Sequence, residues 1–275
     1  MEIRPMRQDD VEPLVDVCAD ALWGPVEPVN RPRQAERIAY LLRSDPGGAW
    51  VADHDGAPVG CALALLREDV WGLSLFALSE AHRTRGTGRR LLNAALEYGA
   101  GSRGGIILSS EHPAAMRLYA RAGFDLRPCV SLTGVVRNPP AAPAGVRDVA
   151  AADLAWMDDV ARAVRGAAYG PDLRWWMDDG TRARCVADRG WLVGRGPKVA
   201  ALLARDEDAA GMLLADHLAA VAPGESVELL FVSAGQDWAV QAGLEAGLAL
   251  TPDGPVFTRG ALGSLRAWIP SGAFL

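Results

Sequence analysis

The stretch Arg83-Thr84-Arg85-Gly86-Thr87-Gly88-Arg89-Arg90 decides the fold of this chain, because it joins two segments of different periodicity. Before it stands the apolar run 73–78, which is typical of a buried strand, and after it the helical pattern Leu91-Leu92-Asn93-Ala94-Ala95-Leu96. A glycine-rich turn between strand and helix directs backbone N–H groups and the positive end of the helix dipole to one spot. Gly86 and Gly88 let phosphate oxygens approach the backbone, so the stretch predicts a pyrophosphate-binding loop.

A second motif, His112-Pro113-Ala114-Ala115-Met116-Arg117-Leu118-Tyr119-Ala120-Arg121-Ala122-Gly123-Phe124, follows the strand-like run Gly105-Ile106-Ile107-Leu108-Ser109. Pro113 suits the first turn of a helix and Gly123 suits its C-terminal cap, so the motif predicts a helix of about ten residues.

The first motif lacks both the Lys-Ser/Thr of a P-loop and the third glycine of a dinucleotide-binding fingerprint. The two familiar nucleotide loops are therefore excluded.

Together the motifs resemble the GCN5-related N-acetyltransferase (GNAT) family, whose signatures are Gln/Arg-x-x-Gly-x-Gly/Ala and Asn-x-x-Ala-x-x-Leu-Tyr-x-x-x-Gly-Phe. The pattern Arg83-x-x-Gly86-x-Gly88 matches the first signature. The run from His112 to Phe124 matches the second, with a histidine where the family usually has an asparagine. The motifs stand in the family's order, and the resemblance covers about residues 1–137.

The resemblance implies that acetyl-CoA is the cosubstrate and that its acetyl group passes directly to an amine. Tyr119 falls on the tyrosine that protonates the departing thiolate, and Leu78 is expected to offer its backbone amide to the thioester carbonyl. The cofactor-binding residues that the resemblance implies are Ala77, Leu78, Arg83, Thr84, Arg85, Gly86, Thr87, Gly88, Arg89, His112, Ala115 and Tyr119.

The general base stays open at this stage. Many family members carry a glutamate on the strand before the glycine loop, but the run Trp71-Gly72-Leu73-Ser74-Leu75-Phe76 holds no carboxylate. A water relay would also serve. The remaining candidates are Glu27, Glu68, Asp69, Glu111 and the C-terminal carboxylate of Leu275.

The acceptor is expected to be a small-molecule or peptide amine, which no motif identifies further. One alternative function is a catalytically silent acyl-CoA sensor or scaffold, and another is a small-molecule acetyltransferase similar to mycothiol synthase. A sensor needs the glycine loop but no proton donor, so the presence of Tyr119 favours an enzyme.

The chain repeats itself. Val146-Arg147 and Asp153-Leu154 echo the residues 143 positions before them, and Ala246-Gly247-Leu248 echoes the residues 124 positions before it. In the second copy, Arg205-Asp206-Glu207-Asp208 stands where the glycine loop would be, and Gly243 takes the position of Tyr119. Gln236 likewise replaces His112. We therefore expect the second copy neither to bind acyl-CoA nor to catalyse.

The predicted fold is α/β, with two tandem GNAT-like domains that each have a mixed sheet and helices on both faces. The expected strands of the first copy lie at 2–7, 49–53, 58–66 and 70–78, its helices at 9–22 and 32–44, and two closing strands within 124–136. The predicted organisation is a catalytic domain at 1–137, a Pro-rich linker at 138–144, a degenerate domain at 145–262 and a C-terminal docking tail at 263–275.

Composition is typical of a globular enzyme, with 50% hydrophobic and 23% charged residues. No apolar run reaches 18 residues free of charge and no signal-peptide core is visible, so we expect a cytoplasmic protein without a membrane partner. A net charge of −6 argues against nucleic-acid binding. The four cysteines lack metal-ligand spacing and are expected to be buried free thiols, with no metal site. Oligomeric state stays open.

Overall fold

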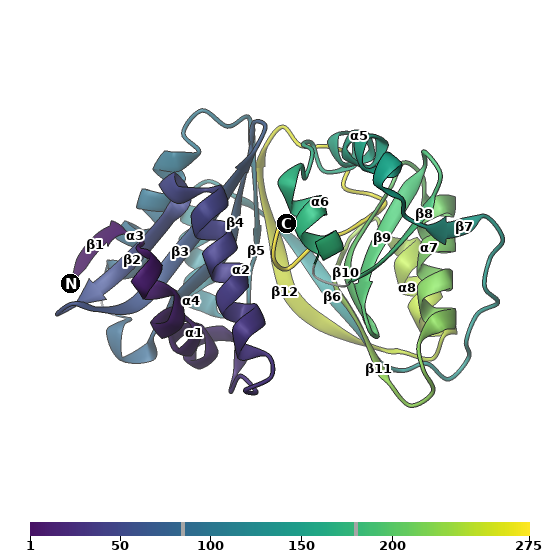
Figure 1. The fold of residues 1–275 in the computed structure, drawn as a ribbon, viewed down its shortest axis with the longest axis horizontal. Coiled ribbons are helices and arrows are strands. Elements are labelled where there is room, and N and C mark those ends of the chain that lie inside the picture. The colour runs from purple at the N-terminus through teal and green to yellow at the C-terminus, as the bar shows by residue number, and fades with distance from the viewer. Residues whose placement is uncertain (84–85, 179–180) are drawn as a thin grey trace. The chain divides into compact units, whose positions relative to one another are not determined.

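The computed structural model describes residues 1–83, 86–178 and 181–275. The chain packs as two compact units. Unit 1 comprises Met1–Ile107 together with Leu275, and unit 2 comprises Leu108–Phe274. In each unit helices cover both faces of a mixed sheet (Figure 1), which confirms the predicted fold class.

The elements of unit 1 are β1 (Glu2–Pro5), α1 (Val11–Cys18), α2 (Arg31–Ser44), β2 (Ala49–His54), β3 (Ala57–Arg67), β4 (Val70–Leu78), α3 (Thr87–Tyr98) and β5 (Gly104–Leu108). Short helical turns η1 to η4 lie at Gln8–Asp10, Ala19–Trp23, Pro46–Gly48 and Glu80–His82. The strands follow the order β1-β2-β3-β4-β5, and among the described pairings in this unit β4 and β5 run parallel while the others are antiparallel. Helices α1 and α2 pack on one face and α3 on the other.

The elements of unit 2 are α4 (Pro113–Arg121), β6 (Asp125–Val135), β7 (Val146–Asp148), α5 (Leu154–Val164), α6 (Pro171–Asp178), β8 (Arg182–Val186), β9 (Gly190–Arg195), β10 (Lys198–Ala204), α7 (Glu207–Ala220), β11 (Ser226–Ser233), α8 (Asp237–Glu245), β12 (Ala249–Gly260) and β13 (Trp268–Ile269). A short turn, η5, lies at Ala151–Asp153. The strand order is β12-β6-β11-β10-β9-β8-β7, with β13 paired to β10.

The compact units do not follow the boundary between the sequence copies. The break falls after Ile107, so α4 and β6, which belong to the first copy by sequence, pack in unit 2. There β6 lies between β11 and β12, which both belong to the second copy, and pairs antiparallel with each. The second copy therefore completes its sheet with a strand supplied by the first.

The sequence predicted two closing strands within 124–136, but the structure has one continuous strand, β6. Pro128 lies in its middle and would leave a gap in a regular ladder, since proline has no N–H to donate. The pairing passes from Arg127↔Val256 to Cys129↔Asp253, so β12 is bulged opposite the proline. The bulge lets β6 continue across Pro128.

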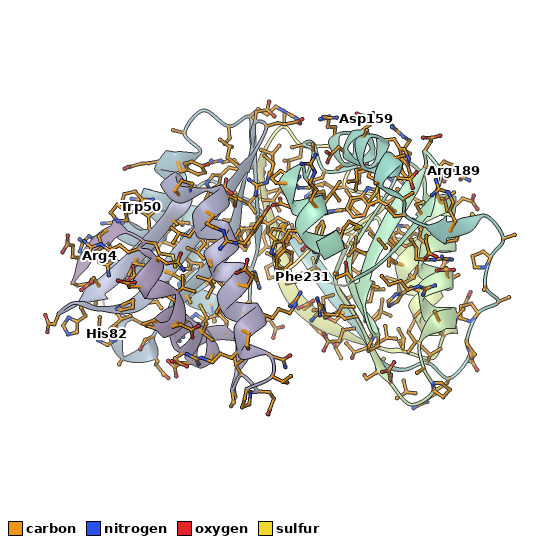
Figure 2. All side chains as sticks on the ribbon, viewed as in Figure 1. Arg4, Trp50, His82, Asp159, Arg189 and Phe231 are labelled. Atoms are coloured by element: carbon orange, nitrogen blue, oxygen red, sulfur yellow. The ribbon has the colours of Figure 1, made fainter. Side chains whose placement is uncertain are left out.

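An arginine–aspartate pair at the start of each copy shows that the repeat is structural. The guanidinium of Arg4 donates to both oxygens of Asp10 at 2.8 Å, and Figure 2 labels Arg4 in this position. Arg147 makes the same two bonds to Asp153 at 2.7 and 2.8 Å, 143 positions later. In each copy the carboxylate also accepts a backbone N–H three residues upstream, at 2.7 Å.

These bonds favour the ionised carboxylates. Hydrogen bonds from Arg147 hold the pKa of Asp153 well below its usual range. The pKa of Asp10 is also lowered, because burial, which alone would raise it, is outweighed by the Arg4 guanidinium. The two aspartates therefore stabilise the fold only while they are charged.

A tight hairpin joins β2 to β3, and the predicted buried free thiols are confirmed. Asp55 and Gly56 both have positive φ between β2 and β3, and Asp53 accepts the N–H of Gly56 at 2.7 Å. All four cysteines are free and buried, with the sulfurs of Cys18 and Cys61 3.9 Å apart. Among the described residues, no helix has the length and apolar character that a membrane span needs.

We expect the double variant Asp10→Asn, Asp153→Asn to be less stable than the wild type at pH 7, by about 1–2 kcal/mol per site. Because both folded-state pKa values are depressed, this stability is present above the unfolded pKa of about 3.9 and is lost as the pH falls towards the folded values. Urea unfolding at pH 7 and pH 3 should show a steeper acid loss for the wild type.

The control variant is Asp159→Asn, whose exposed carboxylate pairs with Arg162 at 2.7 Å. Such surface pairs contribute about 0–1 kcal/mol, so this variant should follow the wild type at both pH values. If the wild type and the double variant lost the same free energy of unfolding between pH 7 and pH 3, the two aspartates would not be the source of the acid sensitivity.

Candidate active site

Strand β4 carries a bulge that separates it from β5. Leu73 pairs with Ala64 and Leu75 pairs with Leu63 on β3, so Ser74 is the extra residue. On the other edge, within the described part of the chain, β4 pairs with β5 only from Val70 to Leu73. A bulge bends its strand, and the last five residues of β4 accordingly continue along β3 without pairing with β5.

The backbone N–H of Leu78 points away from β3, to the edge of β4 on the side of β5. The N–H of Ser79 donates to the carbonyl of Val59 on β3 at 2.9 Å, so these two residues form a hydrogen-bonded pair. Antiparallel pairing alternates, which directs the N–H groups of Leu78 and Phe76 away from β3, whereas that of Ala77 points towards β3. Sequence reasoning named Leu78 and Ala77 but missed Phe76, since the register was needed to find it.

The glycine loop leads from the end of β4 into α3. Gly86 is the residue before the helix and has a φ of +97°, which residues with a Cβ adopt only under strain. A Cβ built there would meet no atom within 4 Å, so the space beside the helix start is open. Thr87, Gly88 and Arg89 form the first turn, whose N–H groups have no acceptor within a helix.

Arg83 connects the loop back to β4, since its side-chain Nε donates to the carbonyl of Leu78 at 3.1 Å. His82, which Figure 2 labels, precedes it and lies with its Nδ1 3.4 Å from the hydroxyl of Ser79. Thr84 and Arg85, which were also predicted to hold the pyrophosphate, lie outside the described residues.

Packing and one side-chain hydrogen bond hold α3 against the sheet. Leu91, Leu92 and Ala95 bury one face of the helix against the sheet. The indole N–H of Trp71, on β4, donates to the carbonyl of Ala95 at 3.0 Å, and Gly99 leaves room for the indole ring. The C-terminal end of α3 is therefore anchored to the start of β4, the strand whose other end carries Leu78.

Unit 2 holds the second motif. The His112 Nδ1 caps α4 by accepting the N–H of Ala114 at 3.2 Å, and Gly123 ends the helix with a φ of +83°, as predicted. Tyr119 is only 4% exposed, and its ring meets the edge of Phe257 at a centroid distance of 5.5 Å. Burial raises the pKa of Tyr119, so the phenol keeps its proton at neutral pH.

The predicted site residues thus fall in two groups. Unit 1 contains Ala77 and Leu78 at the end of β4, Arg83 bonded back to Leu78, and Gly86, Thr87, Gly88 and Arg89 at the start of α3. In unit 2 the helix α4 carries Ala115 and Tyr119, with His112 at its cap.

The candidates for a general base differ in their distance from Leu78 and in their exposure to solvent. Glu68 and Asp69 form the β3–β4 turn, which lies roughly 25–30 Å from Leu78 along β4 at about 3.3 Å per residue, and Asp69 pairs with Arg103. Glu27 and Glu111 are exposed. The buried C-terminal Leu275 groups with unit 1.

The start of α7, which corresponds to the start of α3, is capped by carboxylates. The side chain of Asp206 accepts the N–H of Ala209 at 2.9 Å. Arg189, labelled in Figure 2, bridges Asp206 and Asp208 at 2.6 and 2.8 Å. Negative side chains stabilise a helix N-terminus and repel an anion there, which is the physical reason for the predicted loss of phosphate binding.

The position of Tyr119 is also altered in the second copy. Gly243 is buried in α8, and a Cβ there would come within 2.8 Å of the Leu132 side chain. Gly243, which corresponds to Tyr119, lies where α8 packs against β6. A side chain that could donate a proton would not fit at this position unless Leu132 moved.

Comparison with known proteins finds matches to part of the chain. The profile of the acetyltransferase (GNAT) family matches residues 14–124. A mycothiol acetyltransferase of Clavibacter michiganensis subsp. michiganensis is 33% identical over 120 residues, which is 40% of this chain and 39% of that protein. A second, from Clavibacter sepedonicus, is 31% identical over the same shares. The matched part of the chain therefore spans about two fifths of the length of these relatives.

Solved structures share the whole fold. A Pyrococcus horikoshii protein assigned as an acetyltransferase has a TM-score of 0.81 at 18% identity, covering 100% of this chain and 95% of its own. A tandem GNAT protein from the clavulanic acid biosynthesis pathway has a TM-score of 0.59 at 17% identity, covering 94% of this chain and 98% of its own. Residues 14–124 therefore match the acetyltransferase (GNAT) family, and the whole chain shares the two-unit mixed α/β fold of a solved tandem GNAT protein.

Proposed function

We propose that this chain is an N-acetyltransferase that moves an acetyl group from acetyl-CoA to an amine by direct transfer, and that the first sequence copy carries the chemistry. The observation that carries the proposal is the edge of β4 beyond Leu73, where β4 no longer pairs with β5. This edge presents the N–H of Leu78 a few residues before a helix that starts at a glycine with positive φ.

The residues present fit the cosubstrate. The first turn of α3 supplies backbone N–H groups and a dipole for a pyrophosphate, and the absence of a Cβ on Gly86 leaves the approach open. The pantetheine arm of acetyl-CoA carries amides, which suit the backbone groups along the β4 edge. Acetyl-CoA supplies an activated thioester.

The chain's own groups have separate roles in the proposed reaction. The N–H of Leu78, with that of Phe76 beside it on the same edge, would stabilise the charge that grows on the thioester oxygen. Tyr119 would protonate the leaving thiolate, a role consistent with a phenol that burial keeps protonated. The base that accepts the amine proton stays among the candidates named above or is a water molecule.

The relatives favour a small-molecule acceptor. Both curated relatives are named mycothiol acetyltransferase, so an acceptor of the mycothiol type is the second candidate to be tested beside simple amines and peptide N-termini. The second sequence copy is proposed to act without cofactor, because carboxylates cap α7 and Gly243 replaces the tyrosine.

The proposal is tested by incubating the full chain with acetyl-CoA and a panel of amines while measuring released thiol and the mass of each acceptor. Acetylated product with stoichiometric release of coenzyme A is expected for at least one acceptor. Tight binding of acetyl-CoA without turnover across the panel would instead support the sensor.

The variant Gly86→Ala should lose acetyl-CoA affinity. Its matched control is Gly56→Ala in the β2–β3 hairpin, because Gly56 also has positive φ (+87°) and open space around its Cβ position. Both variants should lose about 1–2 kcal/mol of stability through backbone strain. Calorimetric titration should show weaker binding for Gly86→Ala alone, and equal affinities for the two variants would remove the loop from the site.

The variant Tyr119→Phe should keep its packing against Phe257 and lose turnover by a factor on the order of 10² or more. The control is Tyr98→Phe, which removes a hydroxyl that donates to Asp45 at 3.1 Å and should affect stability only. Steady-state rates with saturating acetyl-CoA give the comparison. A rate for Tyr119→Phe within about threefold of the wild type would show that the proton comes from another group.

A further inference from the structure

The C-terminal segment Leu265–Ile269 lies along the central strand of unit 2. Within it β13 pairs antiparallel with β10, through Leu202↔Ile269 and Leu203↔Trp268. The same two residues of β10 pair with β9 on their other edge. The segment therefore occupies the edge of β10 that faces β11.

This edge of β10 corresponds to the edge of β4 beyond Leu73, which does not pair with β5. In the element order of the second copy, β10 follows the β8–β9 hairpin and precedes α7, just as β4 follows the β2–β3 hairpin and precedes α3. Among the described residues, β10 and β11 pair in parallel only at Lys198↔Glu228, at the start of β10. The second copy thus keeps the split between its central strands and fills it with its own chain.

Each carbonyl from Leu265 to Trp268 accepts a hydrogen bond. The buried side-chain amide of Gln236 donates to Leu265 at 3.0 Å and to Trp268 at 2.5 Å. The indole N–H of Trp238 donates to Arg266 at 3.1 Å, and the backbone N–H of Ala204 donates to Ala267 at 2.9 Å. Gln236 is 0% exposed and stands where the first copy has His112, at the cap of the corresponding helix.

The side chains of the segment are equally fixed. Ala267 and Ile269 belong to the hydrophobic core of unit 2, and Leu265 and Trp268 are also buried. At the end where a pyrophosphate would lie, Arg266 pairs with Glu207, in the first turn of α7, at 3.0 Å. The peptide therefore lies against β10 from Leu202 to Ala204, and the carboxylates of Asp206 and Glu207 stand at the start of α7.

We propose that residues Leu265–Ile269 are a built-in occupant of the second copy's cofactor groove, taking the hydrogen bonds that a pantetheine arm would take. The correspondence with a cofactor groove rests on the proposed function of β4. The chain should therefore bind one coenzyme A, in the first copy alone, and the segment should stay in place when it binds.

Hydrogen–deuterium exchange of the full chain, followed by mass spectrometry with and without saturating coenzyme A, tests this inference. Peptides that cover 265–269 should exchange slowly in both samples, while peptides from the start of α3 gain protection and titration gives one site. Faster exchange of 265–269 with coenzyme A, protection at the start of α7, or a stoichiometry of two would overturn it.

Failure of the proposed function has a different signature. If coenzyme A protects no peptide, the assignment of the β4 edge is wrong, and the exchange of 265–269 still decides whether the segment is seated on β10. Rapid exchange of that segment in the free protein would overturn the inference on its own.

The variant Gln236→Met removes the amide and keeps a side chain of similar length. It should raise the exchange rate of 265–269 by about tenfold, which corresponds to one or two hydrogen bonds. Gln241→Met, at an exposed position of the same helix, is the matched control and should leave the rate unchanged. Coenzyme A affinity should stay at the wild-type value in both.

If Gln236→Met does not fold, Trp238→Phe is the milder variant, because it removes only the bond to Arg266 and keeps an aromatic ring. It should raise the exchange rate of the segment by about threefold. An unchanged rate in whichever variant is folded would show that these side chains do not hold the segment.

Discussion

Backbone groups along the edge of a strand need hydrogen-bond partners, and this requirement shapes the central strand of each unit. In unit 1 the bulge at Ser74 ends the pairing of β4 with β5, and in unit 2 β10 meets β11 only at its start. An unsatisfied buried donor or acceptor costs about 1–3 kcal/mol. In the second copy the chain's own segment Leu265–Ile269 supplies hydrogen-bond partners to this edge. In the first copy the proposed function assigns the corresponding edge to a ligand.

The two copies agree where they need stability and differ where a ligand would bind. The pair Arg4–Asp10 and its counterpart Arg147–Asp153 have the same bonds at nearly the same distances. The helix starts are opposite in character, since α3 begins after a bare glycine and α7 begins at Asp206, which caps it. An N-cap side chain contributes about 1 kcal/mol, so the second copy has the more stable helix start and the first keeps the start that an anion can approach.

Local features of the fold could be predicted from the sequence, because turn and cap residues act within a few positions. Gly123 at the end of α4 and the Asp55–Gly56 turn are examples, and the repeat of Arg4 and Asp10 at Arg147 and Asp153 is visible in the sequence, although their pairing is seen only in the structure. Long-range pairing could not be predicted. The seat of β6 depends on bulges in β11 and β12, and the segment 265–269 has no strand pattern of its own and pairs only because β10 has a vacant edge. The orientation of the Phe76 N–H likewise needed the register.

The insertion of β6 between β11 and β12 determines how the duplicated chain can come apart. This eleven-residue strand precedes the linker, yet its ladder partners follow it. Proteolytic nicking anywhere in 138–144 would break the covalent connection and leave both fragments associated, as in a non-covalently complemented protein. Conversely, a ribosome that has released only the first copy exposes β6 without either of its neighbours, so synthesis must proceed past β12 before this strand is covered on both edges.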